Sequence, residues 1–164
     1  MTDQLDKIIQ RAEKNRSRYI SFLKSLRKKR RIPLESLFKE AHNMAFSNID
    51  CLDCGRCCRM LGPRIENNDI PKLAGRERIK AREFILRYLK TDEDEDLVFR
   101  EMPCPFLGDD NYCSVYEDRP SACRDYPHME RGRQSSRITL HMKNITYCPA
   151  LVIAVEYLMK EIGN

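Results

Sequence analysis

Cysteine is the residue type in this chain whose number and spacing point to chemistry. The sequence contains eight cysteines, and four of them fall within one short segment, 51–58. Thiols this close rarely pair as disulfides, because a disulfide requires a specific Cα separation and dihedral angle. Short C-x2-C loops instead present two sulfurs to one metal ion or cluster. The spacing therefore predicts a metal site whose candidate ligands are Cys51, Cys54, Cys57, Cys58, Cys104, Cys113, Cys123 and Cys148.

The first three cysteines of this segment have the spacing of a cluster-binding run. Cys51, Cys54 and Cys57 form C-x2-C-x2-C, as in a bacterial ferredoxin motif, whose distal ligand is followed by proline. The chain offers two cysteine–proline pairs, one at Cys104 and one at Cys148. Three thiols with one distant pair of this kind suit either a [4Fe–4S] cluster or a four-cysteine zinc site.

Cys58 departs from the ferredoxin-type run. Side chains of adjacent residues diverge by about 100° on a helix and about 180° on a strand. We therefore expect Cys57 and Cys58 to serve different centres, or Cys58 to have a supporting role. The number of centres stays open at this point. The ligands of a second centre would be Cys58, Cys113, Cys123 and whichever of Cys104 or Cys148 the first centre does not use.

Three arginines, Arg56, Arg59 and Arg124, lie next to candidate ligands in the sequence. A zinc ion with four thiolates carries a formal charge of about −2, as does a four-thiolate [4Fe–4S]²⁺ centre. These arginines could offset that charge and donate hydrogen bonds to sulfur, and ordinary surface charge is the alternative. His128 could replace a thiol as ligand, although a hydrogen-bonded structural role is preferred. The other two histidines show no pattern.

Length and composition restrict where such a protein would work. At 164 residues the chain fits one small domain with a modest core. No apolar run approaches the roughly 20 residues that a membrane-spanning helix needs. The first residues lack the apolar stretch of a secretory signal, because charged side chains interrupt them. We therefore expect a cytoplasmic protein, in whose reducing surroundings cysteines serve as metal ligands rather than as disulfides.

Charge divides the chain into a basic arm and a mildly acidic body. Residues 1–32 contain eleven Lys and Arg against three Asp and Glu, whereas residues 33–164 contain nineteen against twenty-two. Apolar residues between Leu5 and Leu26 recur every three or four positions, which predicts an amphipathic helix. The basic run 27–31 lacks interleaved aromatic residues and any nucleic-acid motif, so a solvated helix end or a protein partner is favoured over nucleic acid or an anionic membrane. We expect a basic helical arm at 1–32 and a cysteine-cluster domain at 33–164.

Periodicity also predicts the elements that position the cysteines. Helices are expected over 34–45, after Asp69 to about residue 89 with a break at Gly75, and over 149–162. Short strands are expected over 97–99, 112–116 and 138–142, and a capped single turn is expected to place Cys123. The acidic run 92–96 and the polar residues 131–136 are expected to form loops. The fold class is therefore α+β, mainly α, as a small single domain built around a cysteine-ligated metal site.

The segment 51–58, together with 103–107 and 113–127, resembles the CxxCxxCC cysteine-cluster family. Members of that family are described as zinc- or iron-chelating domains and often as iron–sulfur-cluster-containing proteins. The resemblance covers roughly Cys51 to Pro149 and implies that all eight cysteines bind an iron–sulfur cluster or Zn²⁺. Some relatives are described as flagellin lysine methylases. We do not extend that activity to this chain, because no Gly-rich loop after a strand is present to hold a methyl donor.

Three functions follow from a thiol-bound metal. The first is an iron–sulfur protein in redox or electron transfer. The second is a structural zinc module whose basic helix meets a protein partner, and the third is a metal-delivery module with exchangeable thiolates. The sequence shows no catalytic constellation, since it lacks a phosphate-binding Gly loop and H-E-x-x-H. Enzymatic activity stays open only for a component of an iron–sulfur oxidoreductase.

Overall fold

The computed structural model describes residues 2–29 and 31–163 and divides the chain into two compact units. We call Met1–Cys54 with Pro127–Asn164 the helical unit, and Gly55–Tyr126 the mixed unit. Arg30, within the basic run, lies outside the described residues. Among the helices described, none has the length and apolar character needed to cross a membrane.

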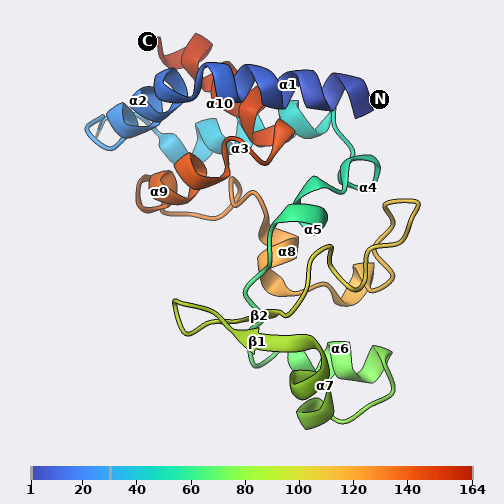
Figure 1. The fold of residues 1–164 in the computed structure, drawn as a ribbon. Helices are drawn as coiled ribbons and strands as arrows, with labels where there is room; N and C mark the ends of the chain where they lie inside the picture. Colours follow the sequence, from blue (N-terminus) through green and yellow to red (C-terminus); the bar gives the residue numbers. More distant parts are fainter. Residues whose placement is uncertain (1, 30, 164) are drawn as a thin grey trace. The chain divides into compact units, whose positions relative to one another are not determined.

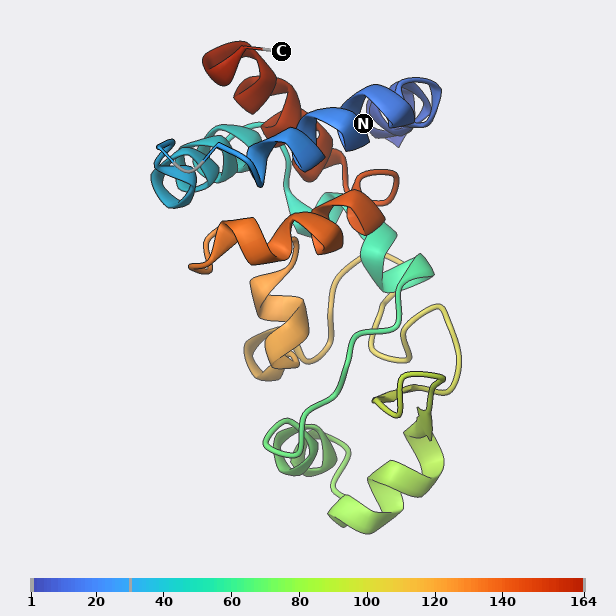
Figure 2. The ribbon, with the colours of Figure 1, turned by 90° about the vertical axis from the view of Figure 1, so that its left-hand side faces the viewer.

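The helical unit combines helices from early and late parts of the sequence. Within the described residues these are α1 (Thr2–Lys14), α2 (Arg16–Leu26), α3 (Leu34–Phe46), α4 (Cys51–Cys54), α9 (Gln134–Asn144) and α10 (Pro149–Ile162). α10 contacts α1, α2 and α3, and α9 contacts α2 and α3. Figures 1 and 2 show this arrangement, with α1 and α2 in blue, α9 in orange and α10 in red. The helices expected over 34–45 and 149–162 are confirmed.

α10 is the centre of the helical unit because most of its surface is apolar. Leu151, Val152, Val155 and Leu158 are completely buried. The apolar stripe of the first helices packs onto it, but that stripe folds as two helices rather than one. The backbone leaves the helical conformation at Asn15, whose side-chain amide donates to the Arg11 carbonyl at 2.9 Å. Such local side-chain bonds compete with helix continuation, which accounts for the break.

Glu156 of α10 binds both of the first two helices. Arg11 of α1 donates from Nε and Nη2 to the two Glu156 carboxylate oxygens at 2.8 and 2.9 Å. The Tyr19 hydroxyl of α2 donates to the same carboxylate at 2.6 Å. α1 and α2 are therefore fixed to α10 by polar as well as apolar contacts. The division of the chain into an arm at 1–32 and a domain at 33–164 stays a prediction.

The mixed unit contains short helices and a two-stranded sheet. Within the described residues its elements are α5 (Arg56–Met60), α6 (Ile70–Arg76), α7 (Ala81–Tyr88), β1 (Leu89–Thr91), β2 (Leu97–Phe99), the 3-10 turn η1 (Tyr116–Asp118) and α8 (Ser121–Asp125). β1 and β2 pair antiparallel, with Leu89 opposite Phe99. The strand expected over 97–99 and the interruption of the helix after Gly75 are confirmed.

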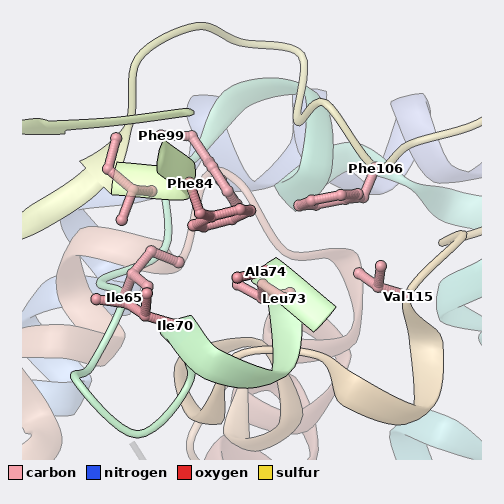
Figure 3. Packing of buried hydrophobic residues seen from close by; sticks show 9 residues of the cluster. Ile65, Ile70, Leu73, Ala74, Phe84, Phe99, Phe106 and Val115 are labelled. Atoms are coloured by element: carbon pink, nitrogen blue, oxygen red, sulfur yellow. The ribbon is translucent and has the colours of Figure 1, made fainter. Parts of the chain in front are cut away.

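Aromatic rings form the core of the mixed unit. Phe106 stacks with Phe84, with ring centroids 6.3 Å apart, and meets Phe99 edge to face at 5.7 Å. Figure 3 shows these rings facing Leu73 of α6, with Val115 on the side of Phe106. This packing holds the loop around Phe106 and the segment around Val115, and those two segments carry Cys104 and Cys113.

Two expected strands are wrong. Residues 138–142 belong to α9, because Gln134, Ile138 and His141 recur at helical spacing and are all completely buried. α9 also begins inside the expected loop 131–136. The strand expected over 112–116 reduces to an isolated bridge between Leu107 and Cys113, after which the chain turns into η1. The fold class, α+β and mainly α, is confirmed.

Candidate metal centre

Four cysteines of the mixed unit come from four separate segments, and backbone contacts join the segments of three of them. The Cys104 backbone N–H donates to the Cys58 carbonyl at 2.7 Å, which joins the loop of Cys104 to α5. The bridge between Leu107 and Cys113 closes the same loop on its other side. Cys123 lies in α8, the short helix that follows η1. The fold thus gathers ligand candidates that are far apart in sequence.

The thiols of these four cysteines lie within electrostatic reach of one another. Burial, and then three neighbouring thiols, raise the pKa of Cys123 to about 12; the neighbours are Cys58, Cys104 and Cys113. Burial raises the pKa of Cys104 to about 11, with Cys58 and Cys113 contributing, and it also raises that of Cys113. A buried thiol beside other thiols resists deprotonation. A bound cation would relieve this penalty, because metal ligation replaces the thiol protons.

The side chains of Cys57 and Cys58 do not diverge as expected from their adjacency. Their sulfurs lie 3.9 Å apart on α5. A zinc ion with bonds of about 2.3 Å holds its sulfurs about 3.8 Å apart, so this separation is compatible with one shared ion. The Cys57 thiol lowers the pKa of Cys58 to about 7, against the effect of burial, and Arg59 and Arg119 act in the same direction as Cys57. Whether the two cysteines serve different centres stays a prediction.

Three cysteines of the helical unit form the second group. Cys148 is buried directly before α10, while Cys51 and Cys54 begin and end α4. Burial raises the pKa of Cys148 to about 12, and the Cys51 and Cys54 thiols contribute. Of the two cysteine–proline pairs, Cys148 therefore lies with Cys51 and Cys54, and Cys104 lies with Cys58. These contacts do not test the prediction that Cys57 binds the same centre as Cys51 and Cys54.

The donor set fits zinc or iron. All eight cysteines are free thiols, and thiolates are the soft ligands that zinc and iron–sulfur clusters prefer. In the part of the chain that the structure describes, no three His, Cys, Asp or Glu side chains already stand in an arrangement that could hold a metal ion. The assignment of the eight cysteines as ligands therefore stays a prediction, supported by their chemistry and their grouping.

Asp69 has a role that local sequence did not indicate. It is the N-cap residue of α6, but its carboxylate makes no capping hydrogen bond to that helix. It is buried and accepts hydrogen bonds from the Ser121 backbone N–H at 3.1 Å and the Ser121 hydroxyl at 3.2 Å. The Glu66 N–H donates to it at 3.1 Å. Because Ser121 is the first residue of α8, Asp69 fixes the start of the helix that carries Cys123.

The arginines around the mixed-unit thiols differ in part from those expected. Arg59 acts on Cys58, as its position beside that residue suggested. The Arg124 guanidinium instead donates to the Arg119 carbonyl. Arg119 was not among the candidates, because no cysteine is adjacent to it, yet its positive charge favours the thiolate forms of Cys58, Cys113 and Cys123.

The histidines all belong to the helical unit. His141 is completely buried, stacks on Phe38 and contacts Gln134 Oε1 through Nε2 at 2.8 Å. Gln134 Nε2 donates to the carbonyls of His128 at 3.0 Å and Met129 at 2.8 Å. This network holds the segment that enters α9. No sequence pattern had marked His141, because its partner Gln134 lies on the stretch that was expected to be a loop.

A mainly helical scaffold bearing grouped free thiols defines a small cysteine-cluster protein. The family model CxxCxxCC, described as "Putative zinc- or iron-chelating domain", matches residues 50–149. That match covers more than half of the chain, so the chain belongs to the CxxCxxCC family of zinc- or iron-chelating domains. Neither the curated proteins nor the solved structures contain a match to it.

Proposed function

We propose that this chain binds an iron–sulfur cluster or zinc through its eight cysteines. In this proposal one centre uses Cys58, Cys104, Cys113 and Cys123 of the mixed unit. A second group uses Cys51, Cys54 and Cys148 of the helical unit, and Cys57 is the eighth candidate ligand. The observation that supports the proposal most directly is the mutual electrostatic effect of the four mixed-unit thiols, which come from four separate segments.

We favour an iron–sulfur protein in redox or electron transfer. The ferredoxin-type spacing of the first three cysteines supports it. So does partial exposure: Cys51 is exposed, and the four cysteines of the mixed-unit centre are only half-buried. A cluster held there would supply one-electron chemistry near the protein surface, and the potential would depend on the charges and hydrogen bonds around its sulfurs.

Structural zinc is the second candidate, and the small core of the mixed unit favours it. That core is formed by Ile65, Ile70, Leu73, Ala74, Phe84, Leu89, Phe99, Phe106 and Val115. A unit of this size gains little net stability from apolar burial alone. A structural zinc ion would contribute folding free energy on the order of 10 kcal/mol. Removal of zinc would then unfold the mixed unit.

Metal analysis of the full chain, purified without oxygen, separates these candidates. Iron with acid-labile sulfide and visible absorption supports the redox protein, and colourless protein with stoichiometric zinc supports the structural module. Absence of both metals would overturn the proposal. Cys123→Ser and Cys148→Ser test the two groups separately, and each serves as the control for the other. We expect each substitution to remove part of the metal and to leave the rest bound.

A further inference from the structure

Two stretches of the helical unit contain no acidic residue. The chain has 25 Asp and Glu, yet none of them falls within 14–34 or within 131–155. The first stretch contains α2 and the second contains α9. The helical unit as a whole has seventeen Lys and Arg against ten Asp and Glu, whereas the mixed unit has thirteen against fifteen. The positive charge of the chain is therefore concentrated in the helical unit.

The fold packs these two stretches against each other. α2 and α9 are in contact, and Figures 1 and 2 show them side by side in blue and orange. Residues of a helix turn by about 100° each, so Arg16, Lys24 and Arg27 lie on one side of α2. Thr139 and Lys143, one turn apart, share a side of α9. The Arg27 guanidinium donates to the Thr139 hydroxyl, which joins the two sides into one surface.

We call these five residues the α2–α9 surface. All five are exposed. Among the residues that the structure describes, none of its four cations forms an ion pair. A group of cations without nearby carboxylates attracts a polyanion.

Three of the four acidic residues that border the two stretches already have partners in the helical unit. Glu156 binds side chains of α1 and α2, as described above. Glu35 accepts a hydrogen bond from the Gln134 backbone N–H at 3.3 Å, and Glu130 pairs with His42 at 3.2 Å. The fourth is exposed on α1. The cations of the α2–α9 surface are therefore available to an external partner.

Exposed side chains decide which anionic partner fits this surface. The large apolar side chains that are exposed, in the part of the chain that the structure describes, are Met60, Leu86 and Tyr112, and all three lie in the mixed unit. A membrane-bound helix inserts such side chains between lipids, and a protein interface is centred on them. Single-stranded nucleic acid is bound by stacking its bases on exposed aromatic rings. The α2–α9 surface offers none of these features.

Hydroxyl groups accompany the cations instead. Ser17 and Ser21 of α2 and Ser136 of α9 are exposed, in addition to Thr139. Arginine, lysine and hydroxyl side chains are the groups that contact phosphate oxygens in protein–nucleic acid complexes. The bases of a duplex are already stacked, so its backbone can be bound without aromatic rings.

We propose that the α2–α9 surface binds the phosphate backbone of duplex nucleic acid, without reading its base sequence. The basic run 27–31, taken alone, favoured a solvated helix end or a protein partner. The fold adds α9 beside α2, and α9 supplies a further cation and hydroxyls that the sequence did not place there. The surface contains no cysteine, so this inference goes beyond the proposed function and does not depend on it.

Fluorescence anisotropy of a labelled DNA duplex of about 20 base pairs, titrated with the full chain between about 50 and 200 mM salt, tests this inference. We expect dissociation constants on the order of micromolar at the lower salt concentration. The logarithm of the association constant should fall linearly with the logarithm of the salt concentration, by about 0.9 per phosphate contacted. Duplexes of unrelated sequence, and an RNA duplex, should bind within about threefold of one another.

The test variant combines Lys24→Gln, Arg27→Gln and Lys143→Gln. We expect it to bind the duplex about 10-fold or more weakly at low salt and to lower the salt slope by about 2 to 3. Should this variant not fold, Lys24→Gln with Lys143→Gln keeps the hydrogen bond of Arg27, and it should show about two-thirds of the change in slope.

The matched control combines Lys72→Gln, Arg82→Gln and Lys90→Gln. These positions are exposed in the mixed unit, and the control loses the same charge from the same residue types. It should bind the duplex within about threefold of the wild type. Metal content per chain should match the wild type in both triple variants, so loss of duplex binding is separated from loss of the proposed metal function.

Equal weakening in the two triple variants would overturn the inference, because it would reflect net charge alone. An unchanged salt slope in the test variant would overturn it as well, as would a preference of more than about 10-fold between duplex sequences. Tighter binding to phosphatidylglycerol vesicles would indicate a membrane partner, and tighter binding to polyglutamate would indicate an acidic protein. Either result, or no binding of the duplex by the wild-type chain, would contradict the proposal.

Discussion

Asp69 and Ser121 are joined by two hydrogen bonds across 52 residues of sequence. The Ser121 N–H donates to one carboxylate oxygen and the Ser121 hydroxyl donates to the other, at 3.1 and 3.2 Å. The two residues stand at the starts of α6 and α8, so a single carboxylate connects the helix under the aromatic core to the helix that carries Cys123.

Loss of this connection should destabilise the mixed unit. We expect Asp69→Asn to lower the free energy of unfolding by about 2 kcal/mol, because an amide nitrogen replaces an oxygen that accepts buried hydrogen bonds. Ser121→Ala should cost about 1 kcal/mol. Urea unfolding of both variants and the double variant gives the coupling energy. If the two losses simply add, the hydrogen bonds are not the source of the effect.

The chain should lose stability in acid through His141. Burial, with His128 and Arg137, lowers the pKa of His141 to about 4, whereas an unfolded histidine has a pKa of about 6.5. As the pH falls, the unfolded chain therefore takes up a proton at this histidine before the folded chain does. The stability contributed by neutral His141 is complete above pH 6.5 and is lost as the pH falls from about 6.5 to 4. The loss is on the order of 3 kcal/mol. Urea unfolding across this range should show a weaker pH dependence in His141→Gln than in the wild type, and parallel curves would contradict the assignment.

Stability in alkali should depend on Tyr19. Burial and the hydrogen bond to Glu156 raise its pKa to about 12, against about 10 in an unfolded chain. The stability that this neutral phenol provides is complete below pH 10 and is lost as the pH rises toward 12. We expect the free energy of unfolding of Tyr19→Phe to fall less steeply with pH over that interval than that of the wild type. At neutral pH the variant should be less stable by about 1 kcal/mol. Tyr112 is exposed to solvent, so Tyr112→Phe is the control and should unfold as the wild type does.

Gly55 and Gly75 should respond oppositely to alanine. Gly55 precedes α5 in the left-handed conformation, with φ +55°, and an added Cβ would lie 2.5 Å from Arg59 Nη1. We expect Gly55→Ala to lower stability by about 1 kcal/mol and to weaken metal binding, since α5 carries Cys57 and Cys58. Gly75 lies within α6 with open space around it. Gly75→Ala should therefore be stabilising by about 0.5 kcal/mol. A destabilised Gly75→Ala would show that the conformational argument is incomplete.

Sequence predicted the elements whose signals are local. The long apolar periodicity of α3 and α10, the strand at 97–99 and the break after Gly75 all depend on neighbouring residues, and all were found. Residues 138–142 were mistaken for a strand because a short run of alternating apolar residues fits both periods. The burial of Gln134 and His141 favours a helix there over a strand. That burial depends on Phe38, which comes from a distant part of the chain.

In the candidate site, too, the sequence predicted what depends on single residues and their spacing, and it did not predict what depends on tertiary structure. Cysteine identity and spacing indicated thiol chemistry and the family, because the type of a residue by itself determines which kind of metal ligand it can be. The choice between Cys104 and Cys148 as companions of Cys51 and Cys54 depended on tertiary structure, as did the hydrogen bonds of Asp69 and the effect of Arg119 on nearby thiols. Each of these residues acts on partners that are distant in sequence or separated from it by a turn. The sequence therefore suggested Arg124, which is adjacent to Cys123, and not Arg119.

The order of the units along the chain has a consequence for biosynthesis. The mixed unit, Gly55–Tyr126, is continuous in sequence, whereas the helical unit needs α10 from the end of the described chain. Domains fold as the chain emerges from the ribosome, beginning with the earlier segments. Cys58, Cys104, Cys113 and Cys123 are therefore all synthesised before Cys148 can join Cys51 and Cys54. In the proposed function, metal loading during translation would therefore begin at the mixed-unit thiols, while Cys51 and Cys54 still lack Cys148.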